Sequence, residues 1–139
     1  MSKATHGQPQ GISHHMASFR LRELATDLKK DPVYGSSGKN ARTLVKDSDL
    51  SLVLTTVRKD AVIHEHKAPA NAALLLIDGE ILFTGSGTGE TTIVEPSQTL
   101  VFPGDFPHSL EARKDSTFLL VIGVRHQVAN SRVSEPRPS

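Results

Sequence analysis

The sequence predicts an all-β protein, a single antiparallel barrel or sandwich preceded by one short helix. Three observations predict it. Short apolar runs rich in Val, Ile, Leu and Thr recur between residues 43 and 124, turn-forming residues separate them, and none of the intervening segments has a helical period. Many short strands at a spacing of roughly ten residues are typical of antiparallel sandwiches and closed barrels.

The expected strands follow from these apolar runs and their boundaries. Asp78-Gly79 is the sharpest hairpin signal, because a type I′ turn needs positive φ at both central residues. Residues 85–89 indicate a flexible hairpin connection; they match no phosphate-binding pattern. We expect strands at Thr43–Val45, Leu50–Val57, Ala61–His66, Ala72–Ile77, Glu80–Thr84, Thr91–Val94, Thr99–Phe102 and Phe118–Val124.

One helix is expected ahead of the strands, over residues 18–31. Its apolar residues recur at i, i+3, i+4 and i+7, the spacing of a single helical stripe. Ser18 can cap its start, and Pro32 ends it at about Asp31. The stripe consists of Leu21, Leu24, Ala25 and Leu28.

The domain organisation is a single domain with two tails. Residues 1–17 are polar and without periodicity, and residues 125–139 return to Arg, Ser and Pro, so we expect both to be flexible. The domain therefore covers residues 18–124, with the barrel over 43–124. The first tail carries His6, His14 and His15, which are either a metal-scavenging tract, part of an appended leader, or simply solvated; we favour the last.

Composition excludes several classes of function. The 139 residues contain no cysteine, which excludes a thiolate nucleophile, an iron–sulfur cluster and a sulfur-based zinc site. The formal net charge of +1 gives no strong field for nucleic acid or for an anionic membrane. The longest apolar run, Ala72–Ile77, is far too short to span a bilayer, and the N-terminus resembles no signal peptide. We expect a cytoplasmic protein without a nucleic-acid or membrane partner.

Three histidines of the strand-rich region are the candidate metal ligands. His64 and His66 form a His-x-His pattern on an expected strand, where alternation places both on one face and Glu65 on the other. Their Cα atoms are then about 7 Å apart, a spacing that suits two ligands of one ion. His108 follows a Pro-Gly turn much farther along the chain. The alternative is that these histidines bind no metal and the barrel holds an organic ligand.

The histidine pattern resembles the cupin superfamily, small jelly-roll barrels with the motifs G-x5-H-x-H-x3/4-E-x6-G and G-x5-P-x-G-x2-H-x3-N. His64, His66 and Gly79 fit the first motif, and Pro103 and His108 fit the second. The leading helix and the stretch HKAPANAALLLIDGEI also look like a group of small stand-alone bacterial cupins. The resemblance implies a double-stranded β-helix barrel, a metal held by His64, His66 and His108, and a homodimer formed through edge strands.

The sequence departs from the cupin pattern at its glycines and at its carboxylate. Alanine or asparagine stands where the ligand glutamate is expected. Three neutral imidazoles bind Zn²⁺, Fe²⁺, Ni²⁺ or Cu²⁺, whereas Mg²⁺ and Ca²⁺ prefer oxygen. Asn71 is a weak possible fourth ligand, or caps a bend after Pro69, which we favour. The departures are Arg58, Ser97 and Asp105 for glycine, Ala70 or Asn71 for glutamate, and Ala112 for asparagine.

Two classes of function remain open. The first is a metal-dependent enzyme, an oxygenase or an isomerase, acting on a small molecule in the barrel. The second is a non-catalytic cupin that binds a small ligand or regulates a partner, with or without metal. In either case we expect Leu76, Phe83 and Phe102 to line the ligand pocket.

Overall fold

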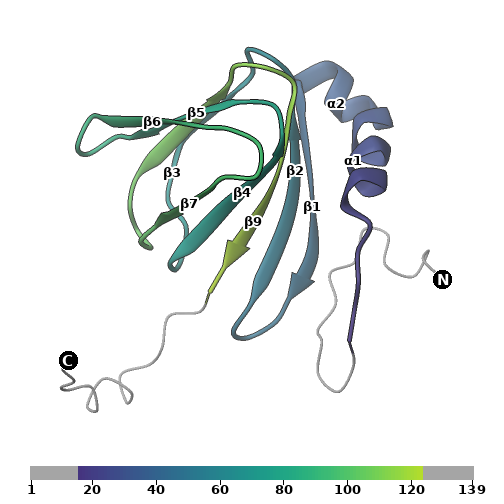
Figure 1. The fold of residues 1–139 in the computed structure, drawn as a ribbon, viewed down its shortest axis with the longest axis horizontal. Helices are drawn as coiled ribbons and strands as arrows, with labels where there is room; N and C mark the ends of the chain where they lie inside the picture. Colours follow the sequence, from purple (N-terminus) through teal and green to yellow (C-terminus); the bar gives the residue numbers. More distant parts are fainter. Residues whose placement is uncertain (1–15, 124–139) are drawn as a thin grey trace.

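The computed structural model describes residues 16–123, and these form two short helices and two antiparallel β-sheets (Figure 1). The expected tails lie almost entirely outside the described residues. The elements are α1 (Leu21–Lys30), α2 (Pro32–Ser37), β1 (Lys39–Lys46), β2 (Ser51–Val57), β3 (Val62–His66), β4 (Ala72–Asp78), β5 (Ile81–Gly85), β6 (Glu90–Val94), β7 (Thr99–Phe102), β8 (His108–Ala112) and β9 (Ser116–Ile122).

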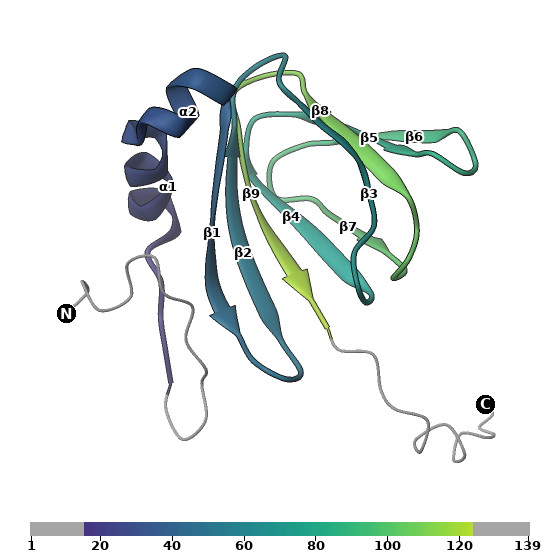
Figure 2. The ribbon, with the colours of Figure 1, turned by 180° about the vertical axis from the view of Figure 1, so that it is seen from behind.

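The two sheets face each other as in a jelly roll, which confirms the predicted fold class (Figure 2). One sheet has five strands in the order β1-β2-β9-β4-β7, and the other has four in the order β3-β8-β5-β6. Most neighbouring strands are distant in the sequence; β1–β2 and β5–β6 are the consecutive strands that pair. The predicted connection at residues 85–89 is thus a hairpin.

The core lies between the two sheets and is built from alternate strand residues. In β4 and β5 every second residue is buried, as expected for strands with one face turned inward. The buried apolar members of this core are Val57, Ala68, Ala72, Leu74, Leu76, Ile81, Phe83, Val94, Phe102, Leu110, Ala112 and Phe118.

Helix α1 covers the outer face of the five-stranded sheet. Its Ala25 and Leu28 are buried against Leu44 and Leu54, as the apolar stripe predicts. Ser18 lies before the helix, and Arg20 occupies the N-cap without a side-chain cap, so the predicted Ser18 cap is wrong. Within the described part of the chain, no helix is long and apolar enough to cross a membrane.

A second short helix follows α1 directly. Pro32 ends α1 but opens α2 at its first position, where a missing N–H costs nothing. Asp31 caps α2 by accepting a hydrogen bond from the Val33 N–H. Arg58 then holds α2 by donating to the carbonyl groups of Tyr34 and Gly35.

The hairpin predicted at Asp78-Gly79 is wrong. Strand β4 pairs with β7 and β9, whereas β5 lies in the other sheet, so this connection crosses between sheets. Gly79 has φ of +99°, but Asp78 is not among the residues with positive φ. Glycine is needed at residue 79 for another reason: a Cβ there would lie 2.5 Å from the Asp115 carbonyl oxygen.

Strand β8, which begins at the candidate ligand His108, is not among the expected strands. Its buried positions alternate with Ser109 and Glu111, so no continuous apolar run marks it. It pairs with both β3 and β5 and is therefore central to the four-stranded sheet.

At two positions where the cupin pattern has glycine, this chain has other residues in the left-handed backbone conformation. Ser97 has φ of +68° and Asp105 has φ of +63°. Residues other than glycine adopt this backbone conformation at a cost of roughly 1–2 kcal/mol. The backbone geometry of the pattern is thus kept without its glycines.

Replacing Ser97 with glycine is expected to stabilise the protein. The relief of the left-handed strain exceeds the entropy that glycine adds to the unfolded chain, so the free energy of unfolding should rise by about 0.5 kcal/mol. Urea denaturation measures this, with Ser97→Ala as the control that keeps the strain. A lower stability for Ser97→Gly than for Ser97→Ala would contradict this explanation.

Candidate metal and ligand site

The candidate site lies at one end of the barrel, which we call the site end. Strand pairing brings the end of β3, the start of β8 and the end of β5 to this place. The start of β4 and the end of β7 lie there in the other sheet. Two backbone contacts join these segments: the Asp105 N–H donates to the Ala68 carbonyl, and the Ser86 N–H donates to the Pro107 carbonyl.

His66 and His108 meet at the site end. They are directly opposite each other on β3 and β8, and their Nε2 atoms lie 3.1 Å apart. The ring centroids are 4.2 Å apart with the planes inclined at 64°. His108 is only 3% exposed, whereas His66 faces solvent, so the pair is reached from the His66 side.

Backbone carbonyl groups fix the tautomer of both rings. The Nδ1 atom of His66 lies 2.9 Å from the His64 carbonyl oxygen, and that of His108 lies 2.9 Å from the Phe106 carbonyl oxygen. A carbonyl oxygen only accepts hydrogen bonds, so each Nδ1 carries the proton and donates it. With both Nδ1 atoms protonated, the two Nε2 atoms at 3.1 Å are both acceptors, and this arrangement is favourable only with a proton or a cation between them. This arrangement suits a shared cation.

The environment of His108 disfavours the protonated form of its ring. Burial lowers the pKa of His108 below its ordinary value, and the nearby His66 lowers that pKa further, while the hydrogen bond to Phe106 opposes the shift. The Phe83 ring stacks on His108 at 5.0 Å and 15°, and the Phe102 ring packs beside it at 4.7 Å. Both the burial of His108 and these ring contacts thus disfavour a positive charge on its imidazole.

His64 does not join the other two histidines in this structure. The register between β3 and β8 shifts between Ile63 and His66, so simple alternation does not hold across the His-x-His segment. The His64 side chain is exposed, as is that of Glu65. Within residues 16–123, no group of three or more His, Cys, Asp or Glu side chains could hold a metal ion.

Asn71 holds a loop at the site end. Its Oδ1 atom accepts a hydrogen bond of 3.0 Å from the Gly104 N–H. The two loops pack closely, since a Cβ on Gly104 would lie 2.7 Å from the Ala70 Cα. Asn71 thus ties its own loop to the loop of Gly104, which differs from the expected cap of a bend after Pro69.

Replacing Asn71 with alanine is expected to lower the free energy of unfolding by about 1 kcal/mol, because one backbone donor loses its partner. Metal affinity should remain within a factor of two of the parent. Urea denaturation and a metal titration on the same protein measure both effects. A large loss of metal affinity at unchanged stability would instead make Asn71 a ligand.

A cavity of about 350 Å³ adjoins the histidine pair. Phe83 and Phe102, two of the residues expected to line a pocket, line it and also pack on His108. Leu76 does not line it, because this side chain is 2% exposed within the core. The lining residues are Phe83, Gly85, Glu90, Thr91, Thr92, Leu100, Val101, Phe102, Pro103 and Phe106.

Sequence reasoning missed Phe106 and the polar residues of β6. Phe106 packs over Gly85, where a Cβ would lie 2.5 Å from the phenyl Cζ atom. A phenylalanine between Asp105 and Pro107 has no periodic pattern that reveals its direction. Glu90 and Thr92 belong to an edge strand whose residues are mostly exposed, so nothing in the sequence assigns them to a cavity.

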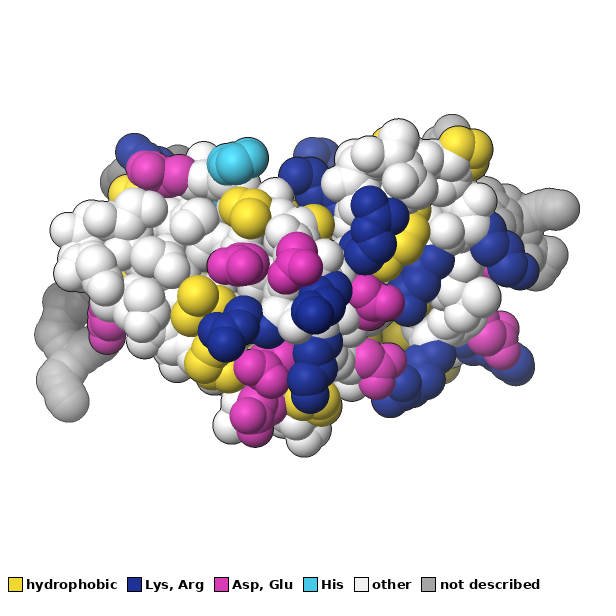
Figure 3. Space-filling model, turned by 90° about the horizontal axis from the view of Figure 1, so that it is seen from above, with side chains coloured by type: hydrophobic (Ala, Val, Ile, Leu, Met, Phe, Trp, Pro, Cys, Tyr) yellow, Lys and Arg dark blue, Asp and Glu magenta, His cyan; other side chains and the backbone are white. Residues whose placement is uncertain are grey.

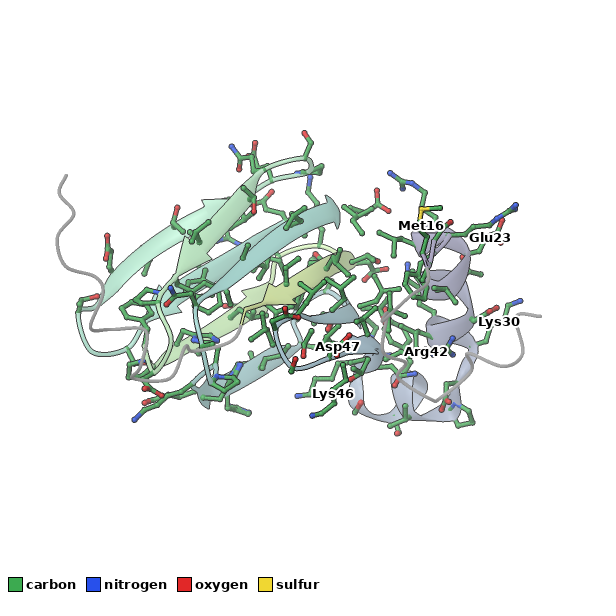
Figure 4. All side chains as sticks on the ribbon, turned by 90° about the horizontal axis from the view of Figure 1, so that it is seen from below. Met16, Glu23, Lys30, Arg42, Lys46 and Asp47 are labelled. Carbon is green, nitrogen blue, oxygen red and sulfur yellow. The ribbon has the colours of Figure 1, made fainter. Side chains whose placement is uncertain are left out.

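A second cavity of about 440 Å³ lies between β1, β2 and the loop before β4. Lys46 and Asp47, labelled in Figure 4, lie at the end of β1 and in the turn that follows it. Pro69 and Ala70 form its other side, next to the segment that carries His66. Both cavities thus flank the loops of the site end.

Structural comparison places the chain among known barrels. No protein-family model matches the sequence, and no curated protein matches it. An RmlC-like cupin protein from Desulfovibrio desulfuricans matches with a TM-score of 0.65 and 21% identity over 78% of this chain and 97% of that one. A conserved protein of unknown function from Streptococcus pyogenes matches with a TM-score of 0.63 and 25% identity over 85% and 97%.

A variant of salicylate 1,2-dioxygenase from Pseudoaminobacter salicylatoxidans has a TM-score of 0.65 at 16% identity, covering 76% of this chain and 34% of that one. These neighbours have low identity, so they establish the fold and not an activity. The two-sheet topology and the motif residues His66, Pro103 and His108 also agree with a cupin fold. The chain is therefore a small protein of the cupin fold.

Proposed function

We propose that the protein holds one divalent transition metal ion on His66 and His108 and binds a small molecule in the adjoining cavity. One observation carries the metal proposal: both Nδ1 atoms are engaged by carbonyl groups, and both Nε2 atoms face each other at 3.1 Å. Metal-ligating histidines characteristically donate the other ring N–H to such a partner. Two Nε2 atoms each about 2.1 Å from one ion fit this separation.

The donor set indicates which ions to expect. Two neutral imidazoles favour Zn²⁺, Fe²⁺, Ni²⁺ or Cu²⁺ and disfavour Mg²⁺ and Ca²⁺, which prefer oxygen ligands. A metal bound there supplies a Lewis acid for an oxygen of a small molecule, or a site for oxygen chemistry. His66 and His108 hold it, while Phe83 and Phe102 exclude water from the buried side of the pair.

A non-catalytic role is the second candidate. The cavity is lined by Phe83 and Phe102 but not by either histidine, so a ligand in it does not touch the pair without a movement of these rings. Solved neighbours include a dioxygenase and the cupin domain of an XRE family transcriptional regulator from Enterobacter cloacae. Oxygen uptake in the presence of candidate substrates distinguishes an oxygenase from an isomerase or a ligand sensor.

Metal binding is tested by equilibrium dialysis against Zn²⁺ or Ni²⁺ at neutral pH. All proteins carry glutamine at His6, His14 and His15, so that the N-terminal histidines do not contribute. We expect one ion per chain, lost in His66→Ala and retained in His64→Ala, the matched control two residues away. Equal retention by both variants, or no metal in the parent, would refute the proposal.

We also propose that the protein is a homodimer. Helix α1 covers the outer face near β1 and β2, whereas Val101 on the edge strand β7 is 69% exposed. An apolar edge strand needs covering to avoid unspecific pairing. Light scattering should give twice the chain mass at micromolar concentration, and Val101→Asp should give a monomer. A monomeric parent would exclude the homodimer.

A further inference from the structure

We propose that the 350 Å³ cavity selects a small ring-bearing molecule with a cationic amine, and that Glu90 recognises the amine. The inference rests on the ligand-binding half of the proposed function and adds the class of ligand. It follows from the register of β6, from the apolar lining of the cavity and from the charge balance of its rim.

The register of β6 directs Glu90 and Thr92 toward the cavity. In the pairing of β5 with β6, Gly85 lies opposite Glu90 and Phe83 lies opposite Thr92. Residues directly opposite each other in an antiparallel pair share one face of the sheet. Phe83 faces the interior, so Glu90 and Thr92 lie on that same inner face, at the rim of the barrel.

The absence of a side chain at Gly85 leaves the space beside Glu90 to Phe106. A Cβ at Gly85 would collide with the Phe106 ring, which therefore lies over this glycine. Phe102 and Phe83, whose ring centroids are 5.0 Å apart, also line the cavity. The ring of a ligand packs well against such phenyl side chains.

The size of the cavity suits one ring with a short side chain. A cavity of about 150 Å³ is enough for a benzene molecule. A cavity of about 350 Å³ therefore has room for a ring and two to four further heavy atoms, at the lower end of the range for ligand pockets.

Glu90 is the only charged residue among the described residues that line the cavity. Within residues 16–123 its carboxylate takes part in none of the ion pairs, which join Arg20 to Glu23, Arg22 to Asp78 and Lys114 to Glu80. Elsewhere, on the face seen from above, basic and acidic side chains lie side by side (Figure 3). An ammonium group at the rim complements this single negative charge, and the Thr92 hydroxyl is an additional acceptor.

The test compares two probes of matched shape, 2-phenylethylamine and 3-phenylpropionate, by titration calorimetry on the full chain. The amine should bind at least about five-fold more tightly than the carboxylate, because Glu90 attracts one charge and repels the other. Glu90→Gln should weaken the amine by roughly three-fold and strengthen the carboxylate. Glu95→Gln is the matched control: this glutamate lies just beyond β6, outside the cavity lining, and should leave both affinities unchanged.

His66→Ala separates the inference from the proposed metal site. If the amine sits at Glu90, its affinity is unchanged in His66→Ala even though metal is lost. If the affinity for the amine falls in His66→Ala but is unchanged in Glu90→Gln, the amine binds the metal. This result overturns the inference and leaves the metal proposal standing. Equal affinities for the two probes, or no binding of either at millimolar concentration, also overturn the inference. If the protein binds no metal but still prefers the amine, only the metal proposal is refuted.

Discussion

Replacing Gly79 with alanine is expected to lower the free energy of unfolding by about 3 kcal/mol or more. Gly79 has φ of +99°, which an L-residue adopts only with strain. Its Cβ would lie 2.5 Å from the Asp115 carbonyl oxygen and 2.6 Å from the Ser116 Cα, both backbone atoms. The crossover between the two sheets must then move away from the turn before β9, as in other overpacked sites.

Gly87→Ala is the matched control for this prediction. Gly87 lies in the β5–β6 turn and has no positive φ, and a Cβ added there would meet no other atom within 4 Å. Its substitution should change the free energy of unfolding by less than about 0.5 kcal/mol. Urea denaturation of both variants measures the difference. Similar stabilities would show that the close approach at Gly79 relaxes without cost.

Replacing His108 with alanine is expected to reduce metal affinity by more than about 100-fold. Loss of a residue that merely orients a ligand already costs about 10- to 100-fold, and His108 is proposed as a ligand itself. The parent and the variant are compared by competition with a chelator of known affinity, again with His6, His14 and His15 replaced by glutamine.

Phe83→Leu separates ligation by His108 from packing around it. It removes the ring stacked on His108 but leaves both Nε2 atoms in place. We expect this variant to lose stability while its metal affinity stays within a few-fold of the parent. If Phe83→Leu and His108→Ala lose the same affinity, the effect of His108 is structural and the ligand assignment fails.

The fold was predictable because strand patterns are local. Apolar runs such as Ala72–Ile77 predict their strands, and the apolar stripe of α1 predicts which face of the helix is buried. Strand pairing is not local. The dipeptide Asp78-Gly79 is compatible with a hairpin and with a crossover between sheets, so the sequence alone does not decide between them. Strand β8 is not predicted because its buried residues alternate with Ser109 and Glu111 over only five positions.

The site was predictable only in part, for the same physical reason. The pairing of His66 with His108 agrees with their motif positions, but the register shift after Ile63 is invisible in the sequence, and it defeats the alternation that grouped His64 with His66. Leu76 was expected at the cavity and lies in the core. Glu90 reaches the cavity rim through its cross-strand position opposite Gly85, which only the fold reveals.

The central claim is that the Nε2 atoms of His66 and His108 are held ready for one cation. Long-range ¹⁵N–¹H NMR of the imidazole rings, recorded at about pH 8 before and after Zn²⁺ addition, tests it most directly because it reports the protonated nitrogen of each ring. We predict the Nδ1–H tautomer for both rings in metal-free protein, and a shift of both Nε2 signals at one equivalent of Zn²⁺. An Nε2–H tautomer in either ring, with no shift on Zn²⁺ addition, would contradict the claim.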